Sequence, residues 1–166
     1  MIRPFRTADF PEVFARVSND EVTRFTGGVL AYEDARQLFQ KALDRQAETF
    51  PFGHRAIALK TSRSNIGYCG LGDLPHVPEM MTEISYGLNR EHWGQGFATE
   101  AASALLPQAF CKLNLSEVVA AIHPLNLASL RVVKKLGLTY RRKIDWPGQG
   151  EVNLYALSRT EYAPHR

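Results

Sequence analysis

The chain lacks the features that mark several large classes of protein. It contains no run of 18 apolar residues, the length that a membrane-spanning helix requires, and its charged N-terminus has no apolar stretch of the secretory-signal kind. The 12 glycines and 9 prolines among 166 residues are too few for a low-complexity or collagen-like chain. We therefore expect a single globular domain over residues 1–166 that does not enter a membrane.

Cysteine is also scarce. Cys69 and Cys111 are far apart and form no C-x-x-C pair, which argues against a zinc site or a disulfide framework. One disulfide between them stays open at this point. We expect two reduced, buried cysteines without a nucleophilic role, no metal, and a cytoplasmic protein.

The charge balance is mild, with a net charge of +3 and a pI of about 9.0. Such a balance suits an anionic small ligand or a solvated surface better than a dedicated DNA-binding protein. No aromatic–basic stacking motif is present, so we expect no direct contact with nucleic acid. Basic residues do gather between Arg131 and Lys143. They form either an exposed helix face followed by a strand end, or a landing site for a phosphate-bearing ligand.

Hydrophobic periodicity and turn residues predict the elements along the chain. In the first part we expect a strand over 2–6, a helix over 8–18 capped by Thr7, a helix over 33–48, and strands over 54–60, 65–74 and 81–89. In the second part we expect a helix over 97–112, a buried strand over 118–122, a helix from Asn126 to the C-cap glycine Gly137, and strands over 138–145 and 151–158. Pro107 should kink the 97–112 helix or end its regular hydrogen bonding near residue 103. This order, without a repeat or a linker, predicts a mixed α/β domain with helices on a central sheet.

One segment joins a strand to a helix through the glycine-rich turn of residues 93–96. A helix N-terminus carries free N–H groups and a partial positive charge, which suit a phosphate or pyrophosphate. Gly94 and Gly96 have no Cβ, so a ligand can approach their backbone closely. The turn is neither a P-loop nor a GxGxxG dinucleotide pattern, and alone it leaves an ordinary strand-to-helix connection open.

Two motifs together resemble the GNAT (Gcn5-related) N-acetyltransferase superfamily. The family pattern Q/R-x-x-G-x-G/A is matched by Trp-Gly-Gln-Gly-Phe-Ala at residues 93–98, with Trp93 in place of the leading Gln or Arg. The pattern A-x-x-x-x-N-x-x-S-x-R-[VL]-x-x-K-x-G is matched at residues 121–137. The sequence WGQGFATEA at 93–101 is similar to the branch that includes the ribosomal-protein alanine N-acetyltransferases.

This resemblance implies a fold and a donor substrate. The fold is an α/β GNAT-like acyl-CoA N-acyltransferase fold whose sheet splays between the strands near 81–89 and 117–122, and acetyl-CoA enters the splay. The pyrophosphate is expected on the backbone N–H groups of residues 94–99, and Asn126 is expected to bond the pantetheine arm. The implied donor-binding residues are Tyr86, Leu88, Trp93, Gly94, Gln95, Gly96, Phe97, Ala98, Thr99, Asn126, Ser129 and Arg131.

Acetyl transfer from a thioester needs a neutral amine, a donor for the oxyanion and a proton for the departing thiolate. The resemblance implies that the Leu88 N–H is the oxyanion donor. The tyrosine that many relatives use to protonate the thiolate would fall at Val133. Ser129 looks like its substitute in the ribosomal-protein branch, although a helical serine can also bond a carbonyl one turn earlier.

The general base is open among three candidates. Glu83 lies on the central strand beside the splay, His123 follows the buried strand, and a water chain needs no dedicated side chain. A weak base favours an α-amine with a pKa near 8 over a lysine near 10.4. The segments 25–28, 73–80 and 146–148 are expected to wall the acceptor side.

We therefore predict an N-acetyltransferase that transfers acetyl from acetyl-CoA to a primary amine by direct attack. The preferred acceptor is the N-terminal α-amine of a peptide or protein. A small amine such as an amino acid, polyamine or antibiotic is the alternative acceptor, and a catalytically silent acyl-CoA sensor is the alternative function. The protein is expected to be a monomer or a homodimer.

Overall fold

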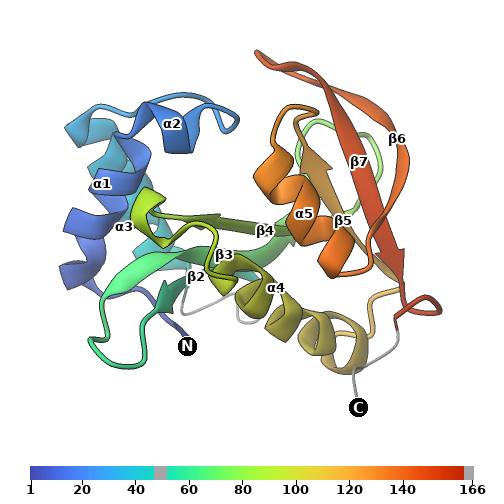
Figure 1. The fold of residues 1–166 in the computed structure, drawn as a ribbon, viewed down its shortest axis with the longest axis horizontal. Coiled ribbons are helices and arrows are strands. Elements are labelled where there is room, and N and C mark those ends of the chain that lie inside the picture. Colours follow the sequence, from blue (N-terminus) through green and yellow to red (C-terminus); the bar gives the residue numbers. More distant parts are fainter. Residues whose placement is uncertain (47–51, 163–166) are drawn as a thin grey trace.

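The computed structural model describes residues 1–46 and 52–162. It contains a seven-stranded sheet with the strand order β1-β2-β3-β4-β5-β7-β6 (Figure 1). The strands are β1 (Ile2–Arg3), β2 (Gly53–Ala58), β3 (Asn65–Asp73), β4 (Thr82–Leu88), β5 (Glu117–Ile122), β6 (Thr139–Trp146) and β7 (Gly150–Ser158). The α-helices are α1 (Phe10–Val17), α2 (Asp20–Thr23), α3 (Tyr32–Arg45), α4 (Phe97–Pro107) and α5 (Leu127–Lys135). The predicted mixed α/β fold is confirmed.

The sheet opens between its two central strands. Strands β1 to β4 form one antiparallel set, and β5, β7 and β6 form another. The parallel strands β4 and β5 share one Cα pair, Glu83 with Val119. Beyond that pair the strands diverge, which confirms the splay predicted between these two segments.

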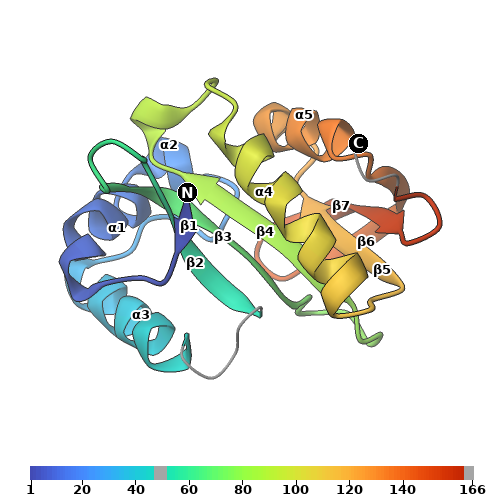
Figure 2. The same cartoon turned by 90° about the horizontal axis from the view of Figure 1, so that it is seen from below.

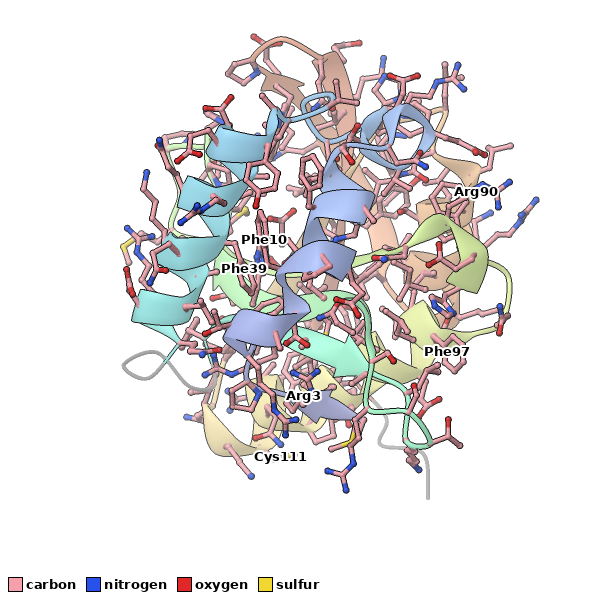
Figure 3. The ribbon with its side chains drawn as sticks, turned by 90° about the vertical axis from the view of Figure 1, so that its left-hand side faces the viewer. Arg3, Phe10, Phe39, Arg90, Phe97 and Cys111 are labelled. Atoms are coloured by element: carbon pink, nitrogen blue, oxygen red, sulfur yellow. The ribbon has the colours of Figure 1, made fainter. Side chains whose placement is uncertain are left out.

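Helices cover both faces of the sheet. Helices α1 and α3 pack on one face of the β1–β4 half, where Phe10 and Phe39 face each other with ring centroids 5.7 Å apart (Figure 3). Helices α4 and α5 lie on the opposite face, and α4 runs along β4 (Figure 2). In α3, Ala35 and Phe39 are four residues apart and both buried, as expected of an amphipathic helix. The sheet therefore has one face covered by α4 and α5 and an opposite face covered by α1 and α3.

The N-terminal region differs from the predicted elements. Only Ile2–Arg3 forms a strand, because Pro4 has no N–H with which to continue the ladder. The predicted cap Thr7 was wrong: it lies in a 3-10 turn before α1, and the Asp9 carboxylate accepts the Arg6 N–H at 2.8 Å. Asp9 also binds the buried Arg3 guanidinium through two hydrogen bonds of 2.7 Å, so a distant partner fixes this helix start.

Two further segments were placed less well by the sequence. The four-residue helix α2 falls in a stretch for which no element was predicted, and it begins where Asn19 Oδ1 accepts the Val22 N–H at 3.1 Å. Helix α3 ends at Arg45, and the expected end at Glu48 lies outside the described residues.

Pro107 changes the helix that carries it. Helix α4 ends at Pro107 and continues as a wider π-helical turn over Gln108–Lys112, because proline cannot donate the next hydrogen bond. This turn buries Phe110 and leaves Cys111 exposed, so the expectation of a buried Cys111 was wrong. Cys69 is fully buried, burial raises the pKa of its thiol to about 12, and both cysteines are free thiols.

In the part of the chain that the structure describes, no helix is long and apolar enough to cross a bilayer.

Candidate active site

The edge of β4 that faces the splay offers unpaired backbone groups. The Asn89 N–H donates to the Ile66 carbonyl at 2.9 Å, so the opposed pair of Leu88 and Gly67 is of the non-hydrogen-bonded kind. The N–H and C=O of Leu88 therefore point away from β3, and the alternation gives Tyr86 the same orientation. Because β5 has already diverged, these groups face the splay. Tyr86 and Leu88 are among the donor-binding residues that the family resemblance implies.

Trp93 forms a hydrogen bond with one of these backbone groups. Its indole N–H donates to the Leu88 carbonyl at 3.0 Å, and the Arg90 guanidinium lies 4.8 Å from the centre of its ring. The Leu88 N–H has no such partner within the described ranges. Trp93 thus braces the turn against the end of β4 and leaves that N–H as the available donor.

The glycine turn has the conformation that an anion requires. Gly94 and Gly96 have φ angles of +75° and +85°, in the left-handed region that favours glycine, and a Cβ on either would point into open space. The first helical bond runs from the Glu100 N–H to the Gly96 carbonyl, so the three preceding N–H groups have no acceptor inside the helix. These groups belong to Phe97, Ala98 and Thr99. The turn therefore fits a pyrophosphate, as the sequence predicts.

Helix α5 presents polar atoms to the other side of the splay. Asn126 caps the helix by accepting the Ser129 N–H at 3.1 Å, and the Tyr86 hydroxyl donates to the Ser129 carbonyl at 3.2 Å. Tyr86 thus bridges β4 and α5. In residues 1–46 and 52–162 the Ser129 hydroxyl makes no hydrogen bond to a carbonyl one turn earlier. Burial raises the pKa of Tyr86, and the Ser129 hydroxyl lies close enough to the Tyr86 hydroxyl to lower that pKa in part. Val133, where many relatives carry tyrosine, is fully buried in the core.

Gln95 and Arg131, two of the predicted donor-binding residues, are held by few contacts. The Gln95 side chain donates to the Glu91 carbonyl at 3.0 Å. Arg131 is exposed on α5 and forms no ion pair with any described residue. The neighbouring basic residues of β6 differ, because Arg141, Arg142 and Lys143 are paired with carboxylates on the surface. Of the basic cluster, the α5 side chains are therefore the ones available to an anionic ligand.

Glu83 lies where the β4–β5 ladder ends. Its Oε1 accepts the Ala121 N–H at 3.4 Å, so the carboxylate replaces a backbone acceptor that β4 no longer supplies. Burial raises the pKa of Glu83 to about 7, although the Ala121 hydrogen bond lowers it in part. A carboxyl group with this pKa can accept a proton near neutral pH.

A hydrogen bond and a stacked aromatic ring hold the His123 side chain. Its Nδ1 accepts the Leu125 N–H at 3.2 Å, and its ring stacks on Phe25 with centroids 4.8 Å apart. An Nδ1 that accepts a hydrogen bond carries no proton, so the proton of the neutral ring is on Nε2. A neutral His123 of this tautomer has no free nitrogen with which to act as a base.

The three segments expected to wall the acceptor side do meet. The His76 and Trp146 rings are 5.1 Å apart, which joins the β3–β4 loop to the β6–β7 hairpin. The Gln149 side-chain amide of the hairpin lies 3.0 Å from the Phe25 carbonyl oxygen and 3.2 Å from the Gly27 nitrogen, so with its NH2 group toward Phe25 it satisfies both groups. The β3–β4 loop, the β6–β7 hairpin and the segment at Phe25, which are far apart in sequence, therefore lie next to one another.

Sequence reasoning missed several polar residues on this face. His54 Nε2 lies 3.0 Å from Ser85 Oγ, and the His54 ring is 4.7 Å from the Tyr68 ring. The protein around His54 lowers the pKa of its imidazole by desolvation, with a smaller contribution from the charge of Arg16. The β2–β3–β4 register places these side chains on the same face as Glu83. The alternation of Glu83 and Ser85 on one strand was the available signal.

Comparison with known proteins assigns the chain to a family. Residues 1–139 match the family model described as an acetyltransferase (GNAT) domain. The chain belongs to the GNAT family of acetyltransferases. It is 31% identical over 139 residues to the uncharacterized N-acetyltransferase YnaD of Bacillus subtilis, a match that covers 83% of this chain and 78% of that protein.

Solved structures share the GNAT fold over nearly the whole chain. A GNAT-family acetyltransferase from Bacillus anthracis superposes with a TM-score of 0.82 at 24% identity, covering 96% of this chain and 95% of the other. The aminoglycoside acetyltransferase AAC(6')-Ib, solved with coenzyme A, gives a TM-score of 0.79 at 16% identity, with 97% and 95% covered. Together with the family match, the open edge of β4 and the glycine turn identify an acetyl-CoA-dependent N-acetyltransferase.

Proposed function

We propose that this GNAT enzyme acetylates a weakly basic primary amine, and that the α-amine at the N-terminus of a peptide or protein is the preferred acceptor. The observation that carries the proposal is the position of Glu83 in the splay with a pKa of about 7. The motif of residues 93–101, similar to the ribosomal-protein branch, supports the same acceptor class.

The pKa of Glu83 is closer to that of an α-amine than to that of a lysine. An α-amine has a pKa of about 8, so its proton moves to a carboxylate of pKa near 7 with an unfavourable difference of about one unit. For a lysine, with a pKa of about 10.4, the same transfer is unfavourable by more than about three units, or roughly 4–5 kcal/mol. Glu83 is therefore suited to the weaker base, either directly or through one water.

The other roles follow from the geometry. We assign the Leu88 N–H to the oxyanion, because it points into the splay without a partner. We assign Ser129 to protonation of the thiolate, because its hydroxyl lies beside the Tyr86 hydroxyl at the α5 side of the splay. The N–H groups of residues 94–99 hold the pyrophosphate, with Arg131 at the rim. When bound, acetyl-CoA supplies the activated acetyl group.

Two alternatives make different predictions. A small amine as acceptor is favoured by the structural likeness to an aminoglycoside acetyltransferase, which shares the fold. A silent acyl-CoA sensor is favoured by the absence of tyrosine at position 133. Release of free CoA with any amine argues against a sensor.

The deciding experiment compares three acceptors at pH 7. The first is a short peptide with a free α-amine, the second is the same peptide acetylated at its N-terminus with one free lysine, and the third is a set of aminoglycosides and polyamines. We expect the free α-amine to give the largest kcat/KM in a free-CoA assay. A larger value for the blocked lysine peptide or for the small amines would overturn the proposed acceptor.

A further inference from the structure

Arg16 is a buried cation without a carboxylate partner. It lies on α1 with 6% of its surface exposed. Its Nη1 donates to Oδ1 of Asn89 at 3.1 Å and to Oδ1 of Asn65 at 3.4 Å. It forms no ion pair within residues 1–46 and 52–162. Because a guanidinium keeps its proton in proteins, the side chain stays positively charged in this setting.

The donors of Arg16 are only partly used. Its Nε is fully buried and has no acceptor. Its Nη2 makes no hydrogen bond to the described chain and is not among the fully buried atoms, so it remains within reach of a ligand. Arg3, which is as buried as Arg16, binds both oxygens of Asp9 at 2.7 Å. Unlike Arg3, Arg16 binds no carboxylate of the described chain, and its unused donors suit an anion that accepts two hydrogen bonds.

The position of Arg16 points to the acceptor side. Its guanidinium carbon lies 5.2 Å from the centre of the Tyr68 ring. That ring lies across β4, since a Cβ on Gly87 would be 2.5 Å from Tyr68 Cε1. Tyr68 is on the face that carries His54 and Ser85, opposite the face that carries Tyr86. Arg16 therefore borders the acceptor face and is separated by the sheet from the acetyl-CoA face.

We propose that the acceptor of this enzyme carries an anionic group, a carboxylate or a phosphate, and that Arg16 binds it while the amine lies in the splay. This inference rests on the proposed function and narrows its substrate class. The Tyr68 ring contacts Arg16 and covers β4 at Gly87, so the proposal puts the anion on Arg16 and the amine in the splay on different sides of this ring. A free α-amino acid, whose amine and carboxylate share one carbon, does not span that separation. A peptide with an acidic side chain, or with its own C-terminal carboxylate, does.

The test uses matched acceptors that differ only in charge. Three pairs of short peptides with a free α-amine are compared: glutamate against glutamine at the second residue, phosphoserine against serine at the second residue, and a tripeptide with a free against an amidated C-terminus. The values of kcat/KM are corrected for the neutral fraction of each α-amine. We expect at least one anionic peptide to exceed its neutral partner by about tenfold or more, as a charge-assisted hydrogen bond allows. Ratios near one in all three pairs would overturn the inference while leaving the α-amine acceptor intact.

Two variants locate the effect. Arg16→Met should bring the anionic-to-neutral ratio close to one, and Arg36→Met should keep it, because Arg36 is an exposed arginine of α3 outside the segments that wall the acceptor side. The ratio is internal to each variant, so a loss of stability does not imitate the result. If Arg16→Met does not fold, Arg16→Lys keeps the charge without the planar fork and should lower the ratio in part. A full ratio in the folded Arg16 variant would contradict the assignment, and failure of every peptide would overturn both the proposed function and this inference.

Discussion

The carboxylate of Glu83 accepts the backbone N–H of Ala121 at 3.4 Å, two residues beyond Val119, the residue of β5 that pairs with Glu83 of β4. The two residues close the sheet at the inner end of the splay. The contact explains why an acidic side chain is tolerated there, because it satisfies an N–H that the diverging strand leaves unpaired. It also places a titratable group next to the open edge of β4. The same opening of the sheet thus produces both the donor site and the candidate base.

Replacing Glu83 by glutamine should alter the pH profile of the reaction. With a peptide α-amine of pKa about 8, log kcat/KM of the native enzyme should fall below pH 7 with a slope near two, because both Glu83 and the amine must lose a proton. In Glu83→Gln the slope should be near one, and kcat should fall roughly a hundred- to ten-thousand-fold. A His123→Gln control should keep the native profile. Native slopes in Glu83→Gln would assign the base to another group or to water.

The same substitution should stabilise the fold at high pH. The pKa of Glu83 is about 7 in the folded protein, against 4.5 for an unperturbed glutamate, so the folded state binds its proton more tightly than the unfolded chain does. The contribution of this group to stability is complete below about pH 4.5 and is lost as the pH rises through about 7. The Tm of Glu83→Gln minus that of the native protein should therefore increase between pH 5 and pH 8. A Tm difference that stays constant over this range would show that Glu83 titrates like an exposed carboxyl group.

Acetyl-CoA affinity should depend on the charge and conformation of Gly96. In Gly96→Glu a side chain at φ +85° enters the open space where the pyrophosphate is expected, and its carboxylate opposes the positive end of α4. We expect calorimetric affinity for acetyl-CoA to fall by more than about tenfold. Gly96→Ala introduces the backbone strain without the charge and should lose less. Equal affinities in the native protein and a folded Gly96→Glu variant would place the donor elsewhere.

Local signals account for most of the fold that the sequence could predict. The apolar run at 118–122 and the cap at Asn126 specify their own elements, because burial on both faces and a capping side chain act within a few residues. The failures occurred where an ion pair or a change in helix geometry altered the local structure. Asp9 starts α1 with the help of Arg3, which no local pattern announces, and the π-helical turn after Pro107 exposes Cys111.

In the candidate site, too, some residues could be predicted from local motifs and others could not. The glycine turn and Asn126 could be found because each is a contiguous motif with a local physical role. His54 and Tyr68 could not, because they come together only through the pairing of β2, β3 and β4. For Arg16 the sequence gives one weak indication of burial. It lies three residues after Val13, on the buried face of an amphipathic helix. A charged residue on an apolar face becomes informative only when its partners are visible.

The hydroxyl and the backbone of Ser129 have separable roles. The Ser129 N–H caps onto Asn126 and its carbonyl accepts the Tyr86 hydroxyl, and neither contact uses Oγ. Ser129→Ala should therefore leave α5 and acetyl-CoA affinity nearly unchanged while kcat falls roughly a hundred-fold or more through loss of the thiolate proton donor. Ser129→Thr keeps a hydroxyl and should recover part of kcat. Calorimetry with acetyl-CoA and turnover with the same peptide separate the two quantities. A decrease in kcat of less than about threefold in Ser129→Ala would reduce Ser129 to a helix residue and leave Tyr86, whose hydroxyl lies at the same turn of α5, as the nearest proton donor.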